Sequence, residues 1–383
     1  MAYPQPCDLP EPGREELAGL TLAAARFFAA RLAGSWVPGY LARRGFGEQA
    51  WRGWTVGYAP GAWTALAHHL RDLGYTDGAI VATGLARRTG RGALVDVFRD
   101  RIMFGIRLPG GTVAGFTGRA RPGHPPPVYL NTRTSVLYRK RSVLFGLYEG
   151  RRALAAGARA VLVEGPLDAI AVTAAGPGRY AGVSPCGTAL TAAQVALLAR
   201  VSDLRRAGVV VAFDGDRAGR RAAVRAYRLL RDQTDQVTTV AFPAGQDETG
   251  QDEAGQDWAG QDEAGQDRPG QSRAGQEPAG QDRGGQDRGG QDPAGFRREH
   301  GGRALARLLD TSAPLADLVA DETMTAFERW LDFPDGKFAA LRAVAPLVAG
   351  LPAGQVARQV ARVAGRLGLS YAEVTEAVTR ALE

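Results

Sequence analysis

Cysteine, histidine and lysine are all scarce in this chain. Its 383 residues include four histidines and two cysteines, Cys7 and Cys186. Two distant cysteines cannot build a disulfide framework, and with four scattered histidines they do not make a zinc site. No apolar run reaches the length of about 18 residues that marks a membrane-spanning helix, and the first residues lack the pattern of a signal peptide. We therefore expect a cytoplasmic protein with no zinc site and no membrane partner.

Lysine occurs twice, at Lys140 and Lys337, against 45 arginines. The net charge is +7, but residues 245–295 contain 12 acidic residues and 4 arginines, so the remaining chain carries +15. A body this basic favours an anionic partner, with nucleic acid the commonest. Charge alone leaves a solvated basic surface equally open.

The chain divides by composition and periodicity. Residues 1–20, rich in Pro, Gly and Glu, predict a flexible arm. Residues 21–157 predict an α+β part and residues 158–243 a parallel α/β sheet, because strand and helix patterns alternate there. Residues 296–383 predict a small helical bundle.

The expected elements follow from these patterns. In the α+β part they are helices at 21–34 and 62–73 and strands at 96–106 and 112–116. In the sheet they are strands at 160–163, 180–184, 209–213 and 237–242 and helices at 167–175, 191–200 and 217–231. In the bundle they are helices at 303–309, 313–331, 337–348, 355–367 and 371–382. Thr191 and Ser370 open capping boxes.

Residues 244–295 contain ten copies of a Gly-Gln-Asp-x-x pentapeptide, with Ser272 and Glu277 replacing the Asp in two copies. Large apolar side chains are almost absent, so this insert cannot bury enough surface to offset its ordering entropy, and we expect disorder. A calcium-binding roll is the functional alternative, but its glycine and aspartate spacing differs. The net charge of −8 suggests a flexible polyanion that competes with nucleic acid for the basic body.

Two pairs of carboxylates follow predicted strands. Glu164 and Asp168 come after the first strand of the sheet, and Asp214 and Asp216 follow its third strand. Parallel α/β sheets bind ligands at the carboxyl ends of their strands, where these four side chains would converge. Oxygen ligands alone suit Mg²⁺ or Mn²⁺. A single acid after a strand is more often a helix cap or a solvated residue, and the paired arrangement is what favours a metal site.

Glu-Gly-x-x-Asp followed by Asp-Gly-Asp-x-Ala-Gly resembles the TOPRIM fold of primases, topoisomerases and some nucleases. Residues 187–191, Gly-Thr-Ala-Leu-Thr, resemble the branch of DnaG-type bacterial primases, as does Asp292-Pro293 after the last strand. Asp247 in the first repeat copy is the alternative to Asp292 as a further metal ligand. The resemblance implies a catalytic set of Glu164, Asp168, Asp214 and Asp216, with Asp292 as an added ligand. Whether Glu164 is a ligand or a general base stays open.

The N-terminal half carries the same resemblance. Residues 40–45, 56–60, 96–104, 115–119 and 129–131 are similar in order and spacing to the RNA-polymerase core of these primases. The resemblance implies that one set of side chains binds nucleic acid or nucleotides: Arg44, Arg99, Arg101, Arg119, Asn131 and Lys140. Arginine binds phosphate with two parallel hydrogen bonds, and lysine acts as a point charge.

The resemblance implies a primase core that synthesises short RNA primers on single-stranded DNA from nucleoside triphosphates, using Mg²⁺ or Mn²⁺. Val128 departs from the lysine that is usual at that position. The zinc ribbon with which the family normally begins is not found, so a separate zinc-ribbon protein is an expected partner. A replicative helicase is the alternative partner that the resemblance implies, and the nucleoid is the expected location. A metal-dependent TOPRIM nuclease and a non-catalytic DNA-binding protein are the alternatives. Cys186, which lacks a nearby histidine, is expected to be a buried structural residue.

Overall fold

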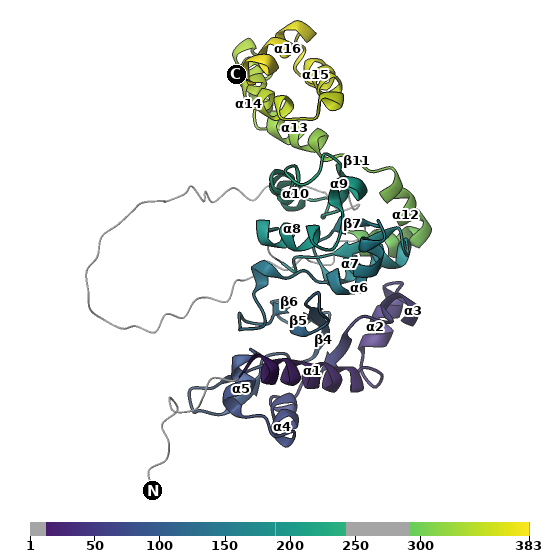
Figure 1. Cartoon of the computed structure of the whole chain (residues 1–383), viewed down its shortest axis with the longest axis vertical. Helices are drawn as coiled ribbons and strands as arrows, with labels where there is room; N and C mark the ends of the chain where they lie inside the picture. Colours follow the sequence, from purple (N-terminus) through teal and green to yellow (C-terminus); the bar gives the residue numbers. More distant parts are fainter. Residues whose placement is uncertain (1–12, 188, 243–291, 383) are drawn as a thin grey trace, which may run out of the picture.

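The computed structural model of the chain describes residues 13–187, 189–242 and 292–382. Three parts follow one another along the long axis (Figure 1). An antiparallel sheet with helices forms one end, a parallel sheet with helices lies in the middle, and a helical bundle forms the other end. Asp247 and the pentapeptide copies up to Gln291 lie outside the described residues, as does the first part of the predicted arm.

The N-terminal part is built on the antiparallel sheet β1-β4-β5-β6. Its elements are α1 (Arg14–Ala30), α2 (Val37–Arg43), α3 (Glu48–Trp51), β1 (Val56–Ala59), α4 (Ala65–Asp72), α5 (Asp77–Ala82), β2 (Ala86–Arg88), β3 (Leu94–Asp96), β4 (Arg101–Arg107), β5 (Val113–Ala120), β6 (Tyr129–Asn131) and the 3₁₀ turn η1 (Lys140–Ser142). The next helix, α6 (Leu147–Ala155), packs on the parallel sheet of the middle part.

Two expectations for this part are wrong in detail. The first helix begins at Arg14, within the predicted flexible arm, because buried Leu17 and Leu20 extend its apolar face backwards. The predicted strand 96–106 is two strands, β3 and β4, separated at Asp100, whose φ of +46° is incompatible with extended backbone. Helix α1 packs directly on β1, since a Cβ at Gly57 would lie 2.6 Å from the Phe28 backbone.

The middle part is the predicted parallel sheet, in the order β11-β10-β9-β7-β8. Only β11 runs antiparallel to its neighbour. Its elements are β7 (Arg159–Leu162), α7 (Pro166–Ala175), β8 (Tyr180–Val183), α8 (Ala192–Ala199), α9 (Leu204–Ala207), β9 (Val209–Val211), α10 (Arg217–Leu230), β10 (Val237–Thr239) and β11 (Ala313–Pro314).

The sheet is buried on both faces, as expected of strands that read as continuous apolar runs. Val161 and Val210 belong to a core that includes α7, whereas their neighbours Leu162 and Val211 belong to a second core with α8 and α10. Alternate residues therefore face opposite helical layers. In Figure 1, α7 and α12 lie on one side of the sheet and α10 on the other.

The C-terminal helices do not form the single bundle that the sequence predicts. Their bounds are α11 (Pro293–His300), α12 (Gly302–Asp310), α13 (Leu315–Thr325), the 3₁₀ turn η2 (Glu328–Trp330), α14 (Pro334–Ala349), α15 (Ala353–Leu367) and α16 (Tyr371–Arg380). Helices α11 and α12 pack on α7, because Leu305 and Leu309 complete the first core. The predicted helix 313–331 ends at Thr325, and α13 to α16 form the bundle.

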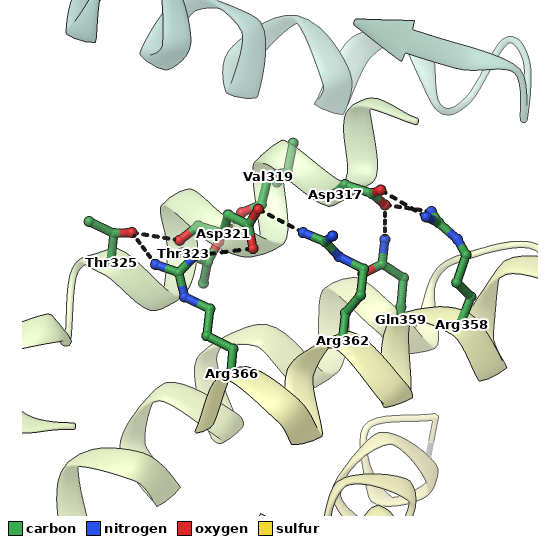
Figure 2. A network of polar contacts seen from close by, with 9 residues as sticks. All are labelled: Asp317, Val319, Asp321, Thr323, Thr325, Arg358, Gln359, Arg362 and Arg366. Atoms are coloured by element: carbon green, nitrogen blue, oxygen red, sulfur yellow. Dashed lines mark hydrogen bonds and ion pairs between the residues drawn. The ribbon is translucent and has the colours of Figure 1, made fainter. Parts of the chain in front are cut away.

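A polar ladder joins α13 to α15 in this bundle (Figure 2). Asp317 accepts hydrogen bonds from Arg358 and from the buried Gln359, and one turn further along Asp321 accepts from Arg362 at 2.7 Å. Helix α13 also packs on α10, which shares a core with the parallel strands. By joining α15 to α13, the ladder therefore connects the bundle to the parallel sheet. The predicted capping boxes at Thr191 and Ser370 are both present.

Candidate functional site

Two carboxylates lie just after the ends of adjacent strands, at the same edge of the parallel sheet. Strands β7 and β9 are parallel neighbours, with Leu162 opposite Val211. The chain leaves β7 toward Glu164 and β9 toward Asp214, so both side chains start from adjacent strand ends. The Asp214 amide donates to Glu164 Oε1 at 3.2 Å, which ties the two strand ends together.

Three further carboxylates stand at the first turns of helices that start at this edge. Asp168 is the third residue of α7, Asp216 caps α10 and Asp292 caps α11. Each accepts backbone N–H groups of its own helix start or loop, such as Gly219 to Asp216 at 2.8 Å. The partial positive charge of a helix amino end stabilises such anions.

Asp168 and Asp292 connect two of these helix starts. The Asp168 side chain is buried and also accepts the Ala294 amide of α11 at 3.1 Å. This contact brings Asp292, at the far end of the pentapeptide insert, to the strand ends. Asp247, the alternative ligand in the first repeat copy, lies outside the described residues, so Asp292 as the further ligand stays a prediction.

The turn after Asp214 needs a glycine. A Cβ at Gly219 would lie 2.1 Å from the Asp214 carbonyl oxygen, so α10 starts closer to the strand end than any side chain would permit. The Asp-x-Ala-Gly pattern in the sequence therefore has a packing reason: it seats Asp214 and Asp216 at the same edge.

These five carboxylates repel one another. Burial, and then the charges of Glu164, Asp168, Asp292 and Asp216, raise the pKa of Asp214 to about 9. Burial followed by the charge of Asp292 raises the pKa of Asp168 well above its usual range, and burial with the charges of Asp216 and Asp292 raises that of Glu164. The cluster is thus strongly anionic and partly protonated near neutral pH.

A cation at this cluster would meet carboxylate oxygens alone, which suits Mg²⁺ or Mn²⁺. Within residues 13–187, 189–242 and 292–382, no group of three or more Asp, Glu, His or Cys side chains is placed so that it could hold a metal ion. The donor chemistry, oxygen atoms of neighbouring carboxylates, fits a divalent cation.

Arginines and aromatic rings from the N-terminal part approach the carboxylates. The Arg119 guanidinium lies 5.0 Å from the centre of the Tyr40 ring and 5.8 Å from that of Tyr129, and Arg44 lies 5.7 Å from the Tyr40 ring. Burial raises the pKa of the Tyr129 hydroxyl, and the charges of Arg119 and Asp168 both act on the same group. Tyr129 therefore stands between the basic side chains and the carboxylates.

Arg101 was predicted to bind nucleic acid, and its placement does not support this. Its side chain is buried and donates to the carbonyls of Gly118, Val128 and Pro127 at 2.9–3.0 Å. Burial lowers the pKa of its guanidinium to about 10. The arginine therefore holds the segment before β6 against β4 and β5.

The other predicted binding residues lie in two groups. Arg99 is half-buried and stacks 4.1 Å from the ring centre of the exposed Trp63. Asn131 donates to the Cys186 carbonyl at 3.1 Å and Lys140 to the Gly187 carbonyl at 3.2 Å. Ser184 in the same loop donates to the Glu164 carbonyl at 2.6 Å, so this loop joins Asn131 and Lys140 to the carboxylate edge. Cys186 is buried, as predicted.

Comparison with known proteins agrees with this geometry. Residues 28–151 match the family described as DNA primase catalytic core, N-terminal domain, and residues 161–260 match the Toprim-like family. The DNA primase of Streptomyces coelicolor is 31% identical over 312 residues, which are 81% of this chain and 41% of that protein. The RNA polymerase domain of Mycobacterium tuberculosis primase DnaG is 28% identical with a TM-score of 0.69, over 92% of this chain and 99% of that one.

The chain is similar to DnaG-type primases over both of these matched ranges. It corresponds to the catalytic core with its TOPRIM fold, as the resemblance implied. A DnaG primase catalytic domain bound to single-stranded DNA is 25% identical, with a TM-score of 0.67 over 94% of this chain and 98% of that one. The chain spans less than half the length of the first curated primases it matches.

Three aromatic residues at the primase core were not predicted as site residues: Tyr40, Trp63 and Tyr129. Tyr40 and Tyr129 lie within segments that resembled the family, and Trp63 lies three residues after one of them, but the set of binding residues that the resemblance implied contained no aromatic residue. A sequence signal exists for Tyr40, which precedes Arg44 by four residues, because aromatic rings interleaved with arginines are typical of single-strand binding. Trp63 and Tyr129 come close to Arg99 and Arg119 only in the folded chain.

The carboxylate cluster predicts how stability depends on pH without divalent cations. An acid whose folded pKa is raised stabilises the fold fully below its unfolded pKa and loses that contribution as pH rises through the folded value. For Asp214 this window runs from its ordinary 3.8 to about 9. The melting temperature should therefore fall across this range. Asp214→Asn should raise the melting temperature at pH 8 by about 1 °C for each 1 kcal/mol of repulsion relieved.

The check is a thermal melt of both proteins in EDTA at several pH values, with Asp232→Asn as the matched control. Asp232 is exposed at the carboxyl end of α10. A melting temperature that is flat with pH, or equal gains from the two substitutions, would contradict the repulsion.

Arg99 and Arg101 should respond differently to the same substitution. Arg101→Gln leaves three buried carbonyls without their charged donor, so it should destabilise the fold by about 2–4 kcal/mol. Arg99→Gln should leave stability within about 0.5 kcal/mol but lower the salt dependence of single-stranded DNA binding by about 0.7 in log–log slope. Denaturant unfolding and binding in a salt series measure both. Unfolding free energies that change equally in the two variants would refute this assignment.

Proposed function

We propose that the protein synthesises short RNA primers on a single-stranded DNA template. The observation that carries this is the meeting of five mutually repelling carboxylates with the arginine and aromatic face of the N-terminal part, through Tyr129. Such a site offers charge for a cation and phosphates on one side and stacking surfaces for unpaired bases on the other. Such a template would place the protein with the nucleoid.

The reaction joins the 3′-hydroxyl of one nucleotide to the α-phosphate of the next. The new O3′–P bond forms as the bond to the β-phosphate oxygen breaks, and pyrophosphate leaves with its charge. Carboxylate-bound Mg²⁺ or Mn²⁺ would supply Lewis-acid stabilisation of the triphosphate and lower the pKa of the hydroxyl. We assign the ligand role to Asp168, Asp214, Asp216 and Asp292, and to Glu164 either that role or that of the base which takes the hydroxyl proton.

The remaining residues hold the substrates. Arg44 and Arg119, stacked on Tyr40 and Tyr129, lie where a triphosphate at the carboxylates would need positive charge. Lys140 and Asn131, tied to the loop after β8, border the same edge. Arg99 with Trp63 forms a stacking surface farther along the N-terminal part, and we assign it to the template.

The test is primer synthesis on single-stranded DNA with labelled ribonucleoside triphosphates and Mg²⁺ or Mn²⁺. The Asp214→Asn/Asp216→Asn variant should lose at least about 100-fold in product while retaining template binding, because only the electrostatic stabilisation is removed. The matched control is Asp232→Asn/Asp235→Asn, which removes the same charge beyond the carboxyl end of α10.

Template degradation without synthesis, abolished in the same variant, would instead establish a nuclease. DNA binding with neither activity, also after a helicase or a zinc-ribbon protein is added, would leave a binding protein and defeat the proposal.

A further inference from the structure

Helix α10 carries a continuous row of arginines on its outer face. It begins directly after Asp216 of the carboxylate cluster and runs from Arg217 to Leu230. Arg217, Arg221, Arg225 and Arg228 are all exposed and recur at steps of four, four and three residues, so they share one face. The helix contains no acidic residue. The row therefore leads from the carboxylate edge toward the opposite edge of the sheet.

These four arginines differ from others in the same region. None of them forms an ion pair with another described residue. On the flank of α10 that faces α13, Arg220 pairs with Glu322 at 3.1 Å. In the neighbouring bundle, the exposed arginines of α15 pair with Asp317 and Asp321 (Figure 2). The fold thus supplies carboxylates where helices pack together, and none to the outer face of α10 among these residues.

The row has a cost for the isolated helix. Like charges four residues apart destabilise a helix, and α10 has two such pairs, Arg217–Arg221 and Arg221–Arg225. Arg217 and Arg221 also lie toward the amino end, where the macrodipole disfavours cations. A polyanion along this face would relieve both effects.

The spacing and composition of the row indicate which polyanion fits. The eleven residue steps from Arg217 to Arg228 span about 16 Å, and over that length of duplex axis one strand carries about five phosphates, at roughly 3.4 Å of axis each. The only aromatic residue of α10, Tyr227, is buried, so this face offers no ring on which an unpaired base could stack. That contrasts with Trp63 beside Arg99 in the N-terminal part. A row of cations without rings suits a backbone whose bases are already paired.

We propose that the outer face of α10 binds the phosphate backbone of the template–primer duplex as it leaves the carboxylate site. This inference rests on the proposed primer synthesis, which supplies the duplex. Because α10 begins at Asp216, newly paired nucleotides would meet Arg217 first and Arg221, Arg225 and Arg228 in turn as the primer grows.

The experiment compares Arg221→Gln/Arg225→Gln with a matched control, Arg303→Gln/Arg307→Gln. The control pair is also exposed and spaced by four residues, but it lies on α12 across the sheet (Figure 1). The probes are a 12-base-pair DNA–RNA hybrid and the DNA strand alone, each titrated over a salt series with the full chain.

The α10 variant should lower the log–log salt slope for the hybrid by about 1.8, which at 0.1 M salt corresponds to roughly 10- to 100-fold weaker binding. The control should retain the slope. With the α10 variant, the first dinucleotide should form at the wild-type rate while longer products become scarce. Equal slopes in both variants would overturn the inference. A lower slope for single-stranded DNA alone would also overturn it. So would an α10 variant that loses binding to polyglutamate, an acidic peptide, while its binding to the hybrid stays unchanged.

Failure of the proposed function is visible separately. A wild-type chain that makes no primers would defeat primer synthesis, whereas the hybrid-binding slopes decide the role of α10 without any catalysis.

Discussion

Repulsion among five carboxylates at one edge of the parallel sheet is the constraint on which the rest of the structure depends. Two of them leave adjacent strand ends, and three stand at helix starts that face the same edge. Burial keeps water from screening them, so the pKa of Asp214 rises to about 9. A fold that keeps such a group together must supply opposite charge, from helix amino ends, from neighbouring arginines and from a cation that exchanges with protons.

The other two parts of the chain are arranged around that edge. The N-terminal part brings Arg44 and Arg119 to it on aromatic rings, and the loop after β8 joins Asn131 and Lys140 to the Glu164 backbone. Helices α11 and α12 bring Asp292 to it from beyond the insert. The bundle of α13 to α16 is fixed to α10 from the other side by α13 and its polar ladder, which leaves the outer face of α10 exposed.

Much of this arrangement could be predicted from the sequence, because it follows from local signals. Apolar runs gave the parallel strands, and an acid after each run located Glu164 and Asp214 at one edge. The burial of Arg101 could not be predicted, since a charged residue in a basic strand reads the same whether it faces solvent or three carbonyls. The break at Asp100 and the packing of α11 on α7 depend on tertiary contacts, namely the hydrogen bonds of Trp36 and Tyr58 to Asp100 and the core contacts of Ala294.

Proton release on cation binding tests the central claim most directly. If repulsion keeps the cluster partly protonated, a divalent cation that replaces the missing charge must displace protons. Calorimetric titration of Mn²⁺ at pH 7.5, in two buffers with different ionisation enthalpies, gives the number of protons released per cation. The account predicts release on the order of one proton, and a clearly smaller release for Asp214→Asn. Identical binding enthalpies in the two buffers would mean that the carboxylates are already fully ionised, and would contradict it.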